Sequence, residues 1–400
     1  MQSSDPGNFF ETDAEQETRK RRAAKAGNRY GNPITLKSKI LAAVADPRFP
    51  SSAVLVAESA GSVRRVNLDD ADNIKTSYRG PTAPVSCVAV GGPDSRTLFA
   101  GSWDKAVWSW DLTTKAPGLK YLGHSDFVKA VVCAKLGETH VLISGGADKK
   151  IIVWDIAAGT RLHTLQDSVV NMLSIQDLVV DHAASKWNEI YLLSASSDPH
   201  IRRWRIRLDA WEQIIDPSPD TPGTERHTIL EHETTVYKLV LDQDTDEVDL
   251  WTASGDGTAK CLSRLKGFAC DDTFHHGAHV RAVAVTDQWV ITAGRDENLK
   301  FWDRTSGKLF CSLEGHYDEV TELVILRSSN GQKRVCSVSI DTTVRSWPLD
   351  KASLGAIAEE QQKPPPTADE NDADEDIEDN GLMMTIDEEA ELAALMEEDD

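Results

Sequence analysis

The chain has 400 residues and a formal net charge of −22, most of which is concentrated at one end. Residues 359–400 hold 18 acidic residues and one basic residue, whereas the rest of the chain carries a charge of only −5. No apolar run approaches the ~20 residues that a membrane-spanning helix needs, and the first residues lack the basic and apolar regions of a secretory signal. Six widely spaced cysteines without a CxxC pair indicate reduced thiols. These features exclude a membrane protein, a disulfide-rich secreted domain and a basic sequence-reading DNA binder, and we expect a protein of the nucleus, the cytoplasm or both.

Residues 1–32 form a polar extension, within which 13–25 is rich in helix-forming residues and predicts a short helix. This helix carries a basic run, Arg19, Lys20, Arg21 and Arg22. The run has three interpretations: a nuclear-import signal, a phosphate-contacting patch, or the solvated face of a frayed helix. The acidic residues just upstream count against phosphate contact.

A repeat of about 40 to 58 residues dominates the middle of the chain. Six segments share a small residue or Ser/Thr, then an aspartate, then an apolar run that ends near tryptophan. Their aspartates are Asp104, Asp148, Asp198, Asp256, Asp296 and Asp341. Tryptophan follows six residues later in five of the six, at Trp110, Trp154, Trp204, Trp302 and Trp347, and Leu262 takes its place in the other. A degenerate seventh unit precedes them, with Ala60 at the aspartate position.

Each unit contains four short β-prone runs separated by turn residues, and several are preceded by a histidine at a fixed offset. Two of these histidines occur in Gly-His dipeptides, and three of the tryptophans occur in Trp-Asp dipeptides. The pattern resembles the WD40-repeat family over about residues 33–350. The resemblance implies an all-β, seven-bladed propeller with four antiparallel strands per blade.

The resemblance also implies structural tetrads of His, Ser/Thr, Asp and Trp within single blades. Three are complete here: His124, Ser144, Asp148 and Trp154; His276, Thr292, Asp296 and Trp302; and His316, Ser337, Asp341 and Trp347. The fifth unit has His232, Thr252 and Asp256 but lacks the tryptophan, and the second has Pro81 and Ala100 instead of the histidine and the hydroxyl. Buried polar chains of this kind stabilise a turn when every member is paired.

The last blade needs an outer strand, because the chain after Trp347 shows no good strand. Residues 33–37 have β character and would supply it, which removes a free sheet edge. The predicted organisation is therefore a propeller over 33–352, an acidic disordered linker over 353–384, and a short acidic amphipathic helix over 385–400.

In the family, partners bind one end of the propeller at positions that flank each aspartate and the first residue of each blade. This implies a partner-binding face made of Trp103, Phe127, Lys129, Tyr237, His279, Arg281 and Arg295. Exposed aromatic residues beside Arg and Lys are typical of interface centres. The alternative for Trp103 is that it packs between blades.

Other motifs fail on inspection. Residues 216–223 contain three prolines and predict a surface loop. Asp242, Asp244 and Asp246 imitate a Ca²⁺ loop but lack its glycine and its final acidic ligand. The histidines near Cys270 match no standard zinc spacing. We therefore expect no metal, no cofactor and no catalytic residues.

The tail carries a second candidate binding motif. Thr385 and Glu388 form a capping box ahead of a helix-prone stretch in which Leu392, Leu395 and Met396 fall on one side. An isolated helix of this length is marginal in water and would become ordered in the groove of a partner. The alternative is an acidic end that only keeps the protein soluble.

These features favour a non-catalytic scaffold or adaptor in an intracellular multiprotein complex, with a monomeric propeller and with other proteins as partners. Two alternatives stay open: a substrate receptor of a ubiquitin ligase, and an accessory subunit of an RNA-processing or ribosome-assembly factor. None of the Trp-Asp sites continues as the Trp-Asp-x-Arg of many ligase receptors. The slightly acidic body makes direct nucleic-acid binding unfavourable.

Overall fold

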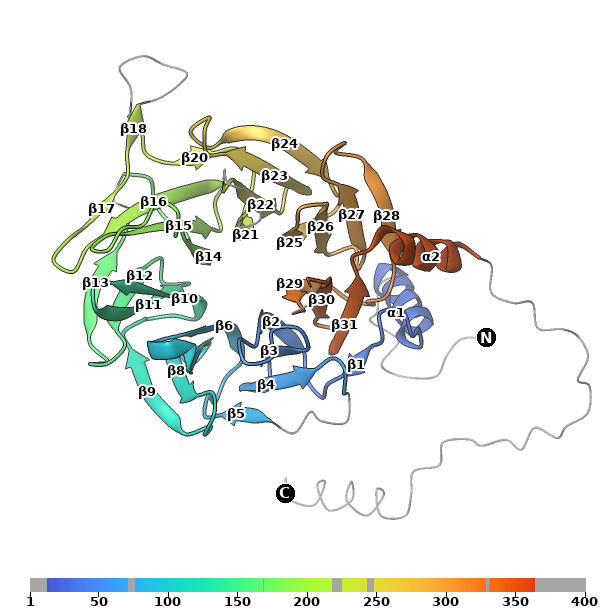
Figure 1. The fold of residues 1–400 in the computed structure, drawn as a ribbon, viewed down its shortest axis with the longest axis horizontal. Helices are drawn as coiled ribbons and strands as arrows, with labels where there is room; N and C mark the ends of the chain where they lie inside the picture. Colours follow the sequence, from blue (N-terminus) through green and yellow to red (C-terminus); the bar gives the residue numbers. More distant parts are fainter. Residues whose placement is uncertain are drawn as a thin grey trace, which may run out of the picture. The chain divides into compact units, whose positions relative to one another are not determined.

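The computed structural model describes residues 13–70, 76–167, 169–217, 225–242, 248–328 and 331–363. Within these ranges, seven antiparallel sheets are arranged in a ring, and their first strands lie nearest the centre (Figure 1). Each of these innermost strands contacts the innermost strands of both neighbouring sheets, and the contact between the first and the last sheet closes the ring. The protein is therefore a seven-bladed β-propeller, as the repeat predicted.

The blades follow chain order. Blade 1 is β2 (Ile40–Ala45), β3 (Ala53–Glu58), β4 (Ser62–Asn67) and β5 (Ser77–Arg79). Blade 2 is β6 (Val85–Gly91), β7 (Thr97–Ser102), β8 (Ala106–Asp111) and β9 (Pro117–Leu122), with a 3₁₀ turn, η2 (Pro93–Ser95), after its first strand. Blade 3 is β10 (Val128–Leu136), β11 (Thr139–Gly146), β12 (Ile151–Asp155) and β13 (Arg161–Leu165).

Blade 4 has a divided outer edge. It consists of β14 (Ile175–Val180), β15 (Ile190–Ser196) and β16 (His200–Ile206), and both β17 (Trp211–Gln213) and β20 (Ile229–Leu230) pair with β16. Between them, β18 (Asp216–Pro217) and β19 (Glu225–Arg226) form a separate two-stranded hairpin. Asp216 and Pro217, the described part of the proline-rich stretch, therefore lie outside the blade sheet, and residues 218–224 fall outside the described ranges.

The remaining blades are regular. Blade 5 is β21 (Val236–Leu241), β22 (Leu250–Ser254), β23 (Thr258–Ser263) and β24 (Ala269–His275). Blade 6 is β25 (Val280–Val285), β26 (Trp289–Gly294), β27 (Leu299–Asp303) and β28 (Leu309–Leu313). Blade 7 is β29 (Val320–Arg327), β30 (Lys333–Ser339) and β31 (Thr343–Pro348), with β1 (Ile34–Thr35) as its outer strand.

The prediction that an N-terminal strand closes the last blade is confirmed. Ile34 pairs with Val344 and Thr35 with Thr343, and the Leu36 N–H donates to the carbonyl of Thr342 at 2.9 Å. Ile34 and Leu36 are buried in the apolar cluster between blades 7 and 1. The two ends of the propeller sequence are thus joined in one sheet.

The hydrophobic core is divided among the seams of the ring. The described residues contain seven clusters of buried apolar side chains, and each cluster is shared by two neighbouring blades. A single four-stranded blade has apolar side chains on both faces and cannot bury them alone. The stability of each blade therefore depends on its neighbours.

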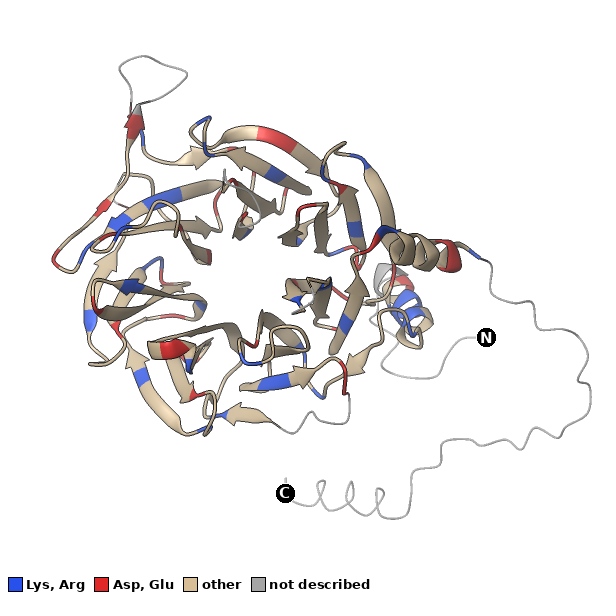
Figure 2. Cartoon of the chain, viewed as in Figure 1, with Lys and Arg blue, Asp and Glu red and all other residues tan. Residues whose placement is uncertain are grey.

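The helix predicted in the N-terminal extension is present as α1 (Asp13–Ala26). It carries the basic run at the outer edge of the ring, where its basic positions appear blue in Figure 2. Arg21 pairs with Glu297 at 2.7 Å, and Arg22 pairs with Asp318 at 2.8 Å. The basic run therefore contacts blades 6 and 7 through these two arginines, whose side chains remain 54% and 44% exposed.

The boundary between propeller and linker also needs correction. The sequence predicted a disordered linker from residue 353, but α2 (Lys351–Gln362) is a helix. The Asp350 carboxylate accepts the Ser353 N–H at 2.8 Å and caps it. Leu354 is fully buried in the core shared by blades 6 and 7, and Gln361 exchanges two hydrogen bonds with the backbone of Glu314.

The predicted acidic linker beyond residue 363 and the tail motif, Leu392, Leu395 and Met396, lie outside the described residues. No helix within the described part of the chain is both long and apolar enough to cross a bilayer.

Candidate functional site

A backbone hydrogen bond repeated in every blade defines one end of the ring. The residue just before each Asp position donates its N–H to the carbonyl of the residue just before the blade's first strand. The donor–acceptor pairs are Ser59–Lys39, Trp103–Pro84, Ala147–Phe127, Ser197–Ser174, Gly255–Thr235, Arg295–His279 and Ile340–Glu319, at 2.8–3.2 Å. Because this contact recurs around the ring, the two sets of residues lie at the same end, which we call the rim.

Two aromatic side chains stack on this rim. The rings of Trp103 in blade 2 and Phe127 ahead of blade 3 are 4.9 Å apart between centroids and only 15° from parallel. They remain 40% and 39% exposed. Trp103 therefore packs between blades, as one of its two interpretations expected, and is also accessible. Large exposed aromatic side chains that are already ordered suit an interface centre.

A β-bulge aims a second set of side chains at the same end. In all seven blades the register of the innermost strand shifts after its first residue. Bulges of this kind re-aim a side chain. The bulge residues are Leu41, Ser86, Lys129, Gln176, Tyr237, Arg281 and Thr321, all half-buried, and we call them the bulge ring.

Within the bulge ring, Lys129 and Arg281 contact neutral groups. The Lys129 ammonium donates to the Gln176 amide oxygen at 3.1 Å. The Arg281 guanidinium lies over the Tyr237 ring, 4.6 Å from its centroid. A Cβ at Gly255 would stand 3.3 Å from the Tyr237 ring, so glycine leaves this ring room. Burial, reinforced by the positive charge of Arg281, lowers the pKa of Lys129 to about 8.

The other two members of the predicted face belong to blade 6. His279 and Arg295 are exposed and are joined by the Arg295 N–H, which donates to the His279 carbonyl at 3.0 Å. All seven predicted face residues therefore belong to the rim or to the bulge ring. Blades 2, 3, 5 and 6 contribute them, and blade 4 adds Gln176, which the sequence did not single out.

The tetrad residues are brought together in three blades. In blade 3, His124 Nε2 is 2.8 Å from Ser144 Oγ and its Nδ1 is 2.9 Å from Asp148 Oδ1. The Trp154 indole N–H donates to the same Ser144 Oγ at 2.8 Å. Blades 6 and 7 repeat this chain through Thr292 and Ser337, with all six distances between 2.7 and 2.9 Å.

These chains have no free nucleophile. Ser144 and Ser337 are fully buried, and each hydroxyl is held between an imidazole and an indole. Burial lowers the pKa of His316 against the opposing effect of Asp341, which favours a neutral ring. Burial alone would raise the pKa of Asp148, but hydrogen bonds from His124 and the Ser125 N–H outweigh it and hold that pKa below its usual value. The His–Asp pairs therefore resemble part of a catalytic triad in composition only.

The two blades with incomplete tetrads, blades 5 and 2, differ in the contacts that their remaining residues make. In blade 5, His232 lies 2.7 Å from the Thr252 hydroxyl and 2.8 Å from Asp256, and Leu262 replaces the indole. In blade 2, Asp104 instead accepts the Trp108 indole N–H at 2.8 Å.

Blade 4 contains a buried cluster that the sequence did not reveal. Arg202 is fully buried and donates to Asp167 at 2.8 Å and to Asp198 at 3.1 Å. The signal in the sequence is weak: blade 4 has the aspartate and the tryptophan but no histidine at the usual offset, and its third strand contains three arginines, of which only Arg202 is buried.

Loss of a tetrad aspartate should destabilise the fold more than loss of Asp104. Asp148→Ala or Asp296→Ala leaves a buried imidazole without its acceptor, and one such orphaned polar group costs about 1–3 kcal/mol. Asp104→Ala should cost less, because the Trp108 indole is only partly buried and water can replace the carboxylate. Urea denaturation of the three variants tests the order, and Asp104→Ala as the most destabilising change would contradict it.

At the next residue of the innermost strands, further from the rim, the charges are paired. We call the bulge ring and these residues, at the centre of the ring of blades, the channel, and the bulge ring is its mouth. Lys238, at the third position of its innermost strand, lies 2.9 Å from Glu322 of blade 7 and 3.6 Å from Asp177 of blade 4. Asp177 also accepts the Leu239 N–H at 2.9 Å. Sequence analysis missed this trio, although charged residues in three otherwise apolar innermost strands were visible.

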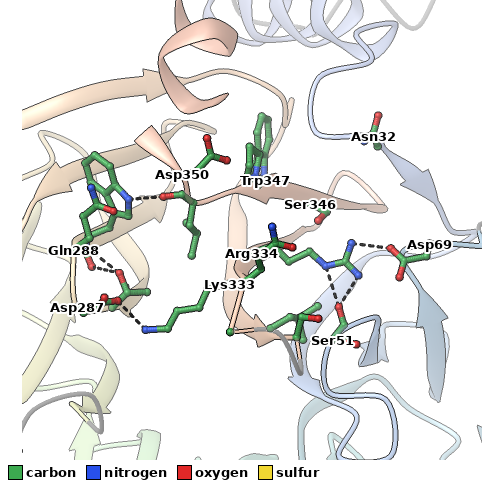
Figure 3. Close-up of a pocket in the computed structure, with 18 residues that line it drawn as sticks. Asn32, Ser51, Asp69, Asp287, Gln288, Lys333, Arg334, Ser346, Trp347 and Asp350 are labelled. Atoms are coloured by element: carbon green, nitrogen blue, oxygen red, sulfur yellow. Dashed lines mark hydrogen bonds and ion pairs between the residues drawn. The ribbon is translucent and has the colours of Figure 1, made fainter. Parts of the chain in front are cut away.

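A cavity of about 700 Å³ lies among the loops of blades 1, 6 and 7. Its polar side chains are engaged with one another (Figure 3): Arg334 pairs with Asp69 at 2.8 Å and donates to the Ser51 carbonyl, and Lys333 pairs with Asp287 at 2.7 Å. These contacts join neighbouring blades. Among the described residues, no group of three or more His, Cys, Asp or Glu side chains is placed to hold a metal ion.

Comparison with known proteins agrees with this architecture. The family model "WD domain, G-beta repeat" matches residues 72–111 and 268–303, and the model "tRNA methyltransferase TRM82 WD40 domain" matches residues 120–177. An uncharacterised WD repeat-containing protein of Schizosaccharomyces pombe is 27% identical, over 99% of this chain and 100% of its own length. The p21-activated protein kinase-interacting protein 1-like of Gallus gallus is 23% identical, over 70% of this chain and 67% of its own. Mitochondrial division protein 1 of Vanderwaltozyma polyspora is 26% identical over 63% of this chain, which spans only 31% of that protein. With seven four-stranded blades, three His–Ser/Thr–Asp–Trp chains and these matches, the chain belongs to the WD40-repeat β-propeller family.

Proposed function

We propose that this protein is a non-catalytic scaffold or adaptor that holds a partner protein on the rim around Trp103 and Phe127. The observation that carries the proposal is the stacked pair, which is ordered by its own contact and yet about 40% exposed. Side chains that are already fixed lose little conformational entropy when a partner binds. The name of the Gallus gallus relative, which describes a protein that interacts with a kinase, supports an interaction role for this fold.

The test is affinity purification of the tagged full-length protein from its own cell, compared with Trp103→Ala and Phe127→Ala. Truncating an interface anchor costs about 2 kcal/mol or more, so each variant should lose the proteins that copurify with the wild type. The matched control is Trp187→Ala, because Trp187 is 61% exposed in the loop between β14 and β15, at the opposite end of its blade from the rim. Partners that persist in both rim variants, or disappear with Trp187→Ala, would contradict the proposal.

A second candidate is an accessory subunit of an RNA-modifying enzyme. The match to the TRM82 WD40 domain favours it, because residues 120–177 include Phe127 and Lys129 on the proposed face. In that case the protein lost by the rim variants should be the catalytic subunit of such an enzyme, which mass spectrometry of the copurifying proteins identifies. The same purification, done on nuclear and cytoplasmic fractions, tests the location.

A further inference from the structure

The bulge ring holds two cations and no carboxylate. Its members reach toward neighbouring blades at one level: Ser86 donates to the Val128 carbonyl, and Thr321 donates to the Ile40 carbonyl at 3.1 Å. Lys129 contacts Gln176 of blade 4, and Arg281 contacts Tyr237 of blade 5. The two cations thus lie at the ends of an arc formed by blades 3, 4, 5 and 6.

Within the described ranges, neither cation has a counter-ion in ion-pair contact. Among the described residues, no carboxylate forms an ion pair with Lys129 or Arg281, and the Tyr237 hydroxyl donates no hydrogen bond to any of them. A half-buried ammonium without a carboxylate is costly, because it has lost water and gained only one amide contact. Burial and the charge of Arg281 lower the pKa of Lys129 to about 8, and they outweigh the opposing effect of the Asp126 carboxylate, which forms no ion pair with it.

The carboxylates of Asp177 and Glu322, one residue further from the rim, cannot act as counter-ions for the two cations. Asp177 and Glu322 are both held by Lys238, and each also accepts a backbone N–H, from Leu239 and Leu323. The channel therefore has a charge-paired level around Lys238 and, at its mouth, two cations that no carboxylate of the described residues pairs. The mouth adjoins the rim, since Phe127 is only two residues before Lys129.

We propose that the channel mouth between Lys129 and Arg281 receives a carboxylate side chain from an acidic peptide segment of the partner, while an adjacent apolar side chain of that segment lies on Trp103 and Phe127. The inference rests on the proposed function, in which the rim binds a protein. Charge-assisted hydrogen bonds to both cations would replace the water that these groups have lost. The unused Tyr237 hydroxyl would supply a further donor.

An acidic peptide fits this site better than a nucleic acid does. A nucleic acid presents a continuous row of phosphates and needs an extended basic surface. Here Glu319 belongs to the same rim, and Asp126 is close enough to Lys129 to raise its pKa, in a chain whose net charge is −22. A single carboxylate side chain needs only the two cations, Lys129 and Arg281.

The test uses the full-length protein and a hexapeptide in which three glutamates flank one phenylalanine. The readout is the NMR signal of the Trp103 indole N–H, assigned by its loss in Trp103→Phe. The peptide should shift this signal in a saturable way. The same peptide with glutamine in place of each glutamate should bind at least tenfold more weakly, and a hexamer of uridine should not compete with the acidic peptide. Raising the salt from 0.1 to 1 M should weaken binding, because the Debye length falls from ~10 to ~3 Å.

Lys129→Gln and Arg281→Gln should each lower the affinity for the peptide about tenfold, a change that corresponds to about 1.4 kcal/mol. The matched control is Lys149→Gln, which removes the same charge from an exposed turn at the same end of blade 3. Lys129→Met, which keeps the apolar stem, separates loss of charge from loss of packing, and the melting temperature of each variant checks its fold. Equal binding of the two peptides, preference for the uridine hexamer, or affinities unchanged by the Lys129 and Arg281 variants would overturn the inference.

The two proposals can fail separately. If Trp103→Ala abolishes capture of the native partner while Lys129→Gln and Arg281→Gln retain it, the rim binds a protein without a carboxylate in the channel mouth. The proposed function then stands and this inference falls. If none of the three variants affects capture, both fall.

Discussion

Deletion of residues 1–40 should abolish cooperative unfolding, whereas deletion of residues 1–25 should leave a cooperative but less stable protein. The longer deletion removes β1, and with it the backbone pairs to Thr343 and Val344 and the hydrogen bond from Leu36 to Thr342. It also removes Ile34, Leu36 and Ile40 from the core between blades 7 and 1. The stability of the ring depends on the contacts between all neighbouring blades, and without β1 the sheet of blade 7 has an unpaired edge.

The shorter deletion acts through charge. Glu297 is only 3% exposed and accepts hydrogen bonds from Arg21 at 2.7 Å and Lys25 at 3.3 Å. Without α1 this carboxylate loses both cations. One unpaired polar group of this kind costs about 1–3 kcal/mol.

The measurement is urea denaturation of both truncations, followed by tryptophan fluorescence and far-UV circular dichroism. Coincident transitions by the two probes indicate two-state unfolding. Glu297→Gln in the full-length protein is the matched control, because it removes the same ion pairs and keeps β1. Equal stability of the two truncations would contradict the role assigned to β1.

The propeller and its closing strand could be predicted because both rest on patterns with a fixed period. The Asp positions recur once per blade, and the missing outer strand after Trp347 required a strand from elsewhere. Helix α2 has no such pattern. It is ordered by the burial of Leu354 against the core of blades 6 and 7 and by the contacts of Gln361 with Glu314, neither of which is local in sequence. Helix propensity alone did not predict this docking.

In the candidate site too, the positions that recur with the repeat could be predicted, whereas the contacts between blades could not. The family pattern selected Trp103, Phe127, Lys129 and Arg281 because each stands at a fixed offset from a repeat position. Which partner each residue has depends on its neighbour across a seam. The stacking of Trp103 on Phe127 joins blades 2 and 3, and the contact of Lys129 with Gln176 joins blades 3 and 4. Repeat spacing identifies equivalent positions within blades but carries no information on pairs between them.

Removal of Arg202 should destabilise the protein as strongly as any single side-chain change in the ring. Arg202 and Asp167 are both fully buried, and Arg202 also contacts both carboxylate oxygens of Asp198, at 3.1 and 3.2 Å. Arg202→Met conserves much of the volume but leaves two carboxylates without their cation. Breaking a buried pair in this way costs about 3–5 kcal/mol, because a charge stays buried and uncompensated.

The pH dependence of the unfolding free energy distinguishes loss of the ion pair from loss of packing, because loss of packing alone would not change with pH. Burial alone would raise the pKa of Asp167, but hydrogen bonds from the Val170 N–H and from Arg202 outweigh it and hold that pKa below its usual value. In the wild type this aspartate therefore contributes stability above the pKa of the unfolded chain, and the contribution is lost as the pH falls through the lowered folded pKa. In Arg202→Met the folded pKa should rise, so protonation relieves the defect. The difference in unfolding free energy between variant and wild type should be largest near pH 7 and should shrink toward pH 4.

Urea denaturation at a series of pH values measures both effects. Arg205→Ala is the matched control, since Arg205 lies on the same strand and its partner Glu212 is 46% exposed, so stability should change little. The double variant Arg202→Met/Asp167→Asn should recover part of the loss, because it removes one of the two stranded charges. A defect in Arg202→Met that is small, or that is constant from pH 4 to pH 7, would show that the cluster contributes packing and not charge pairing to blade 4.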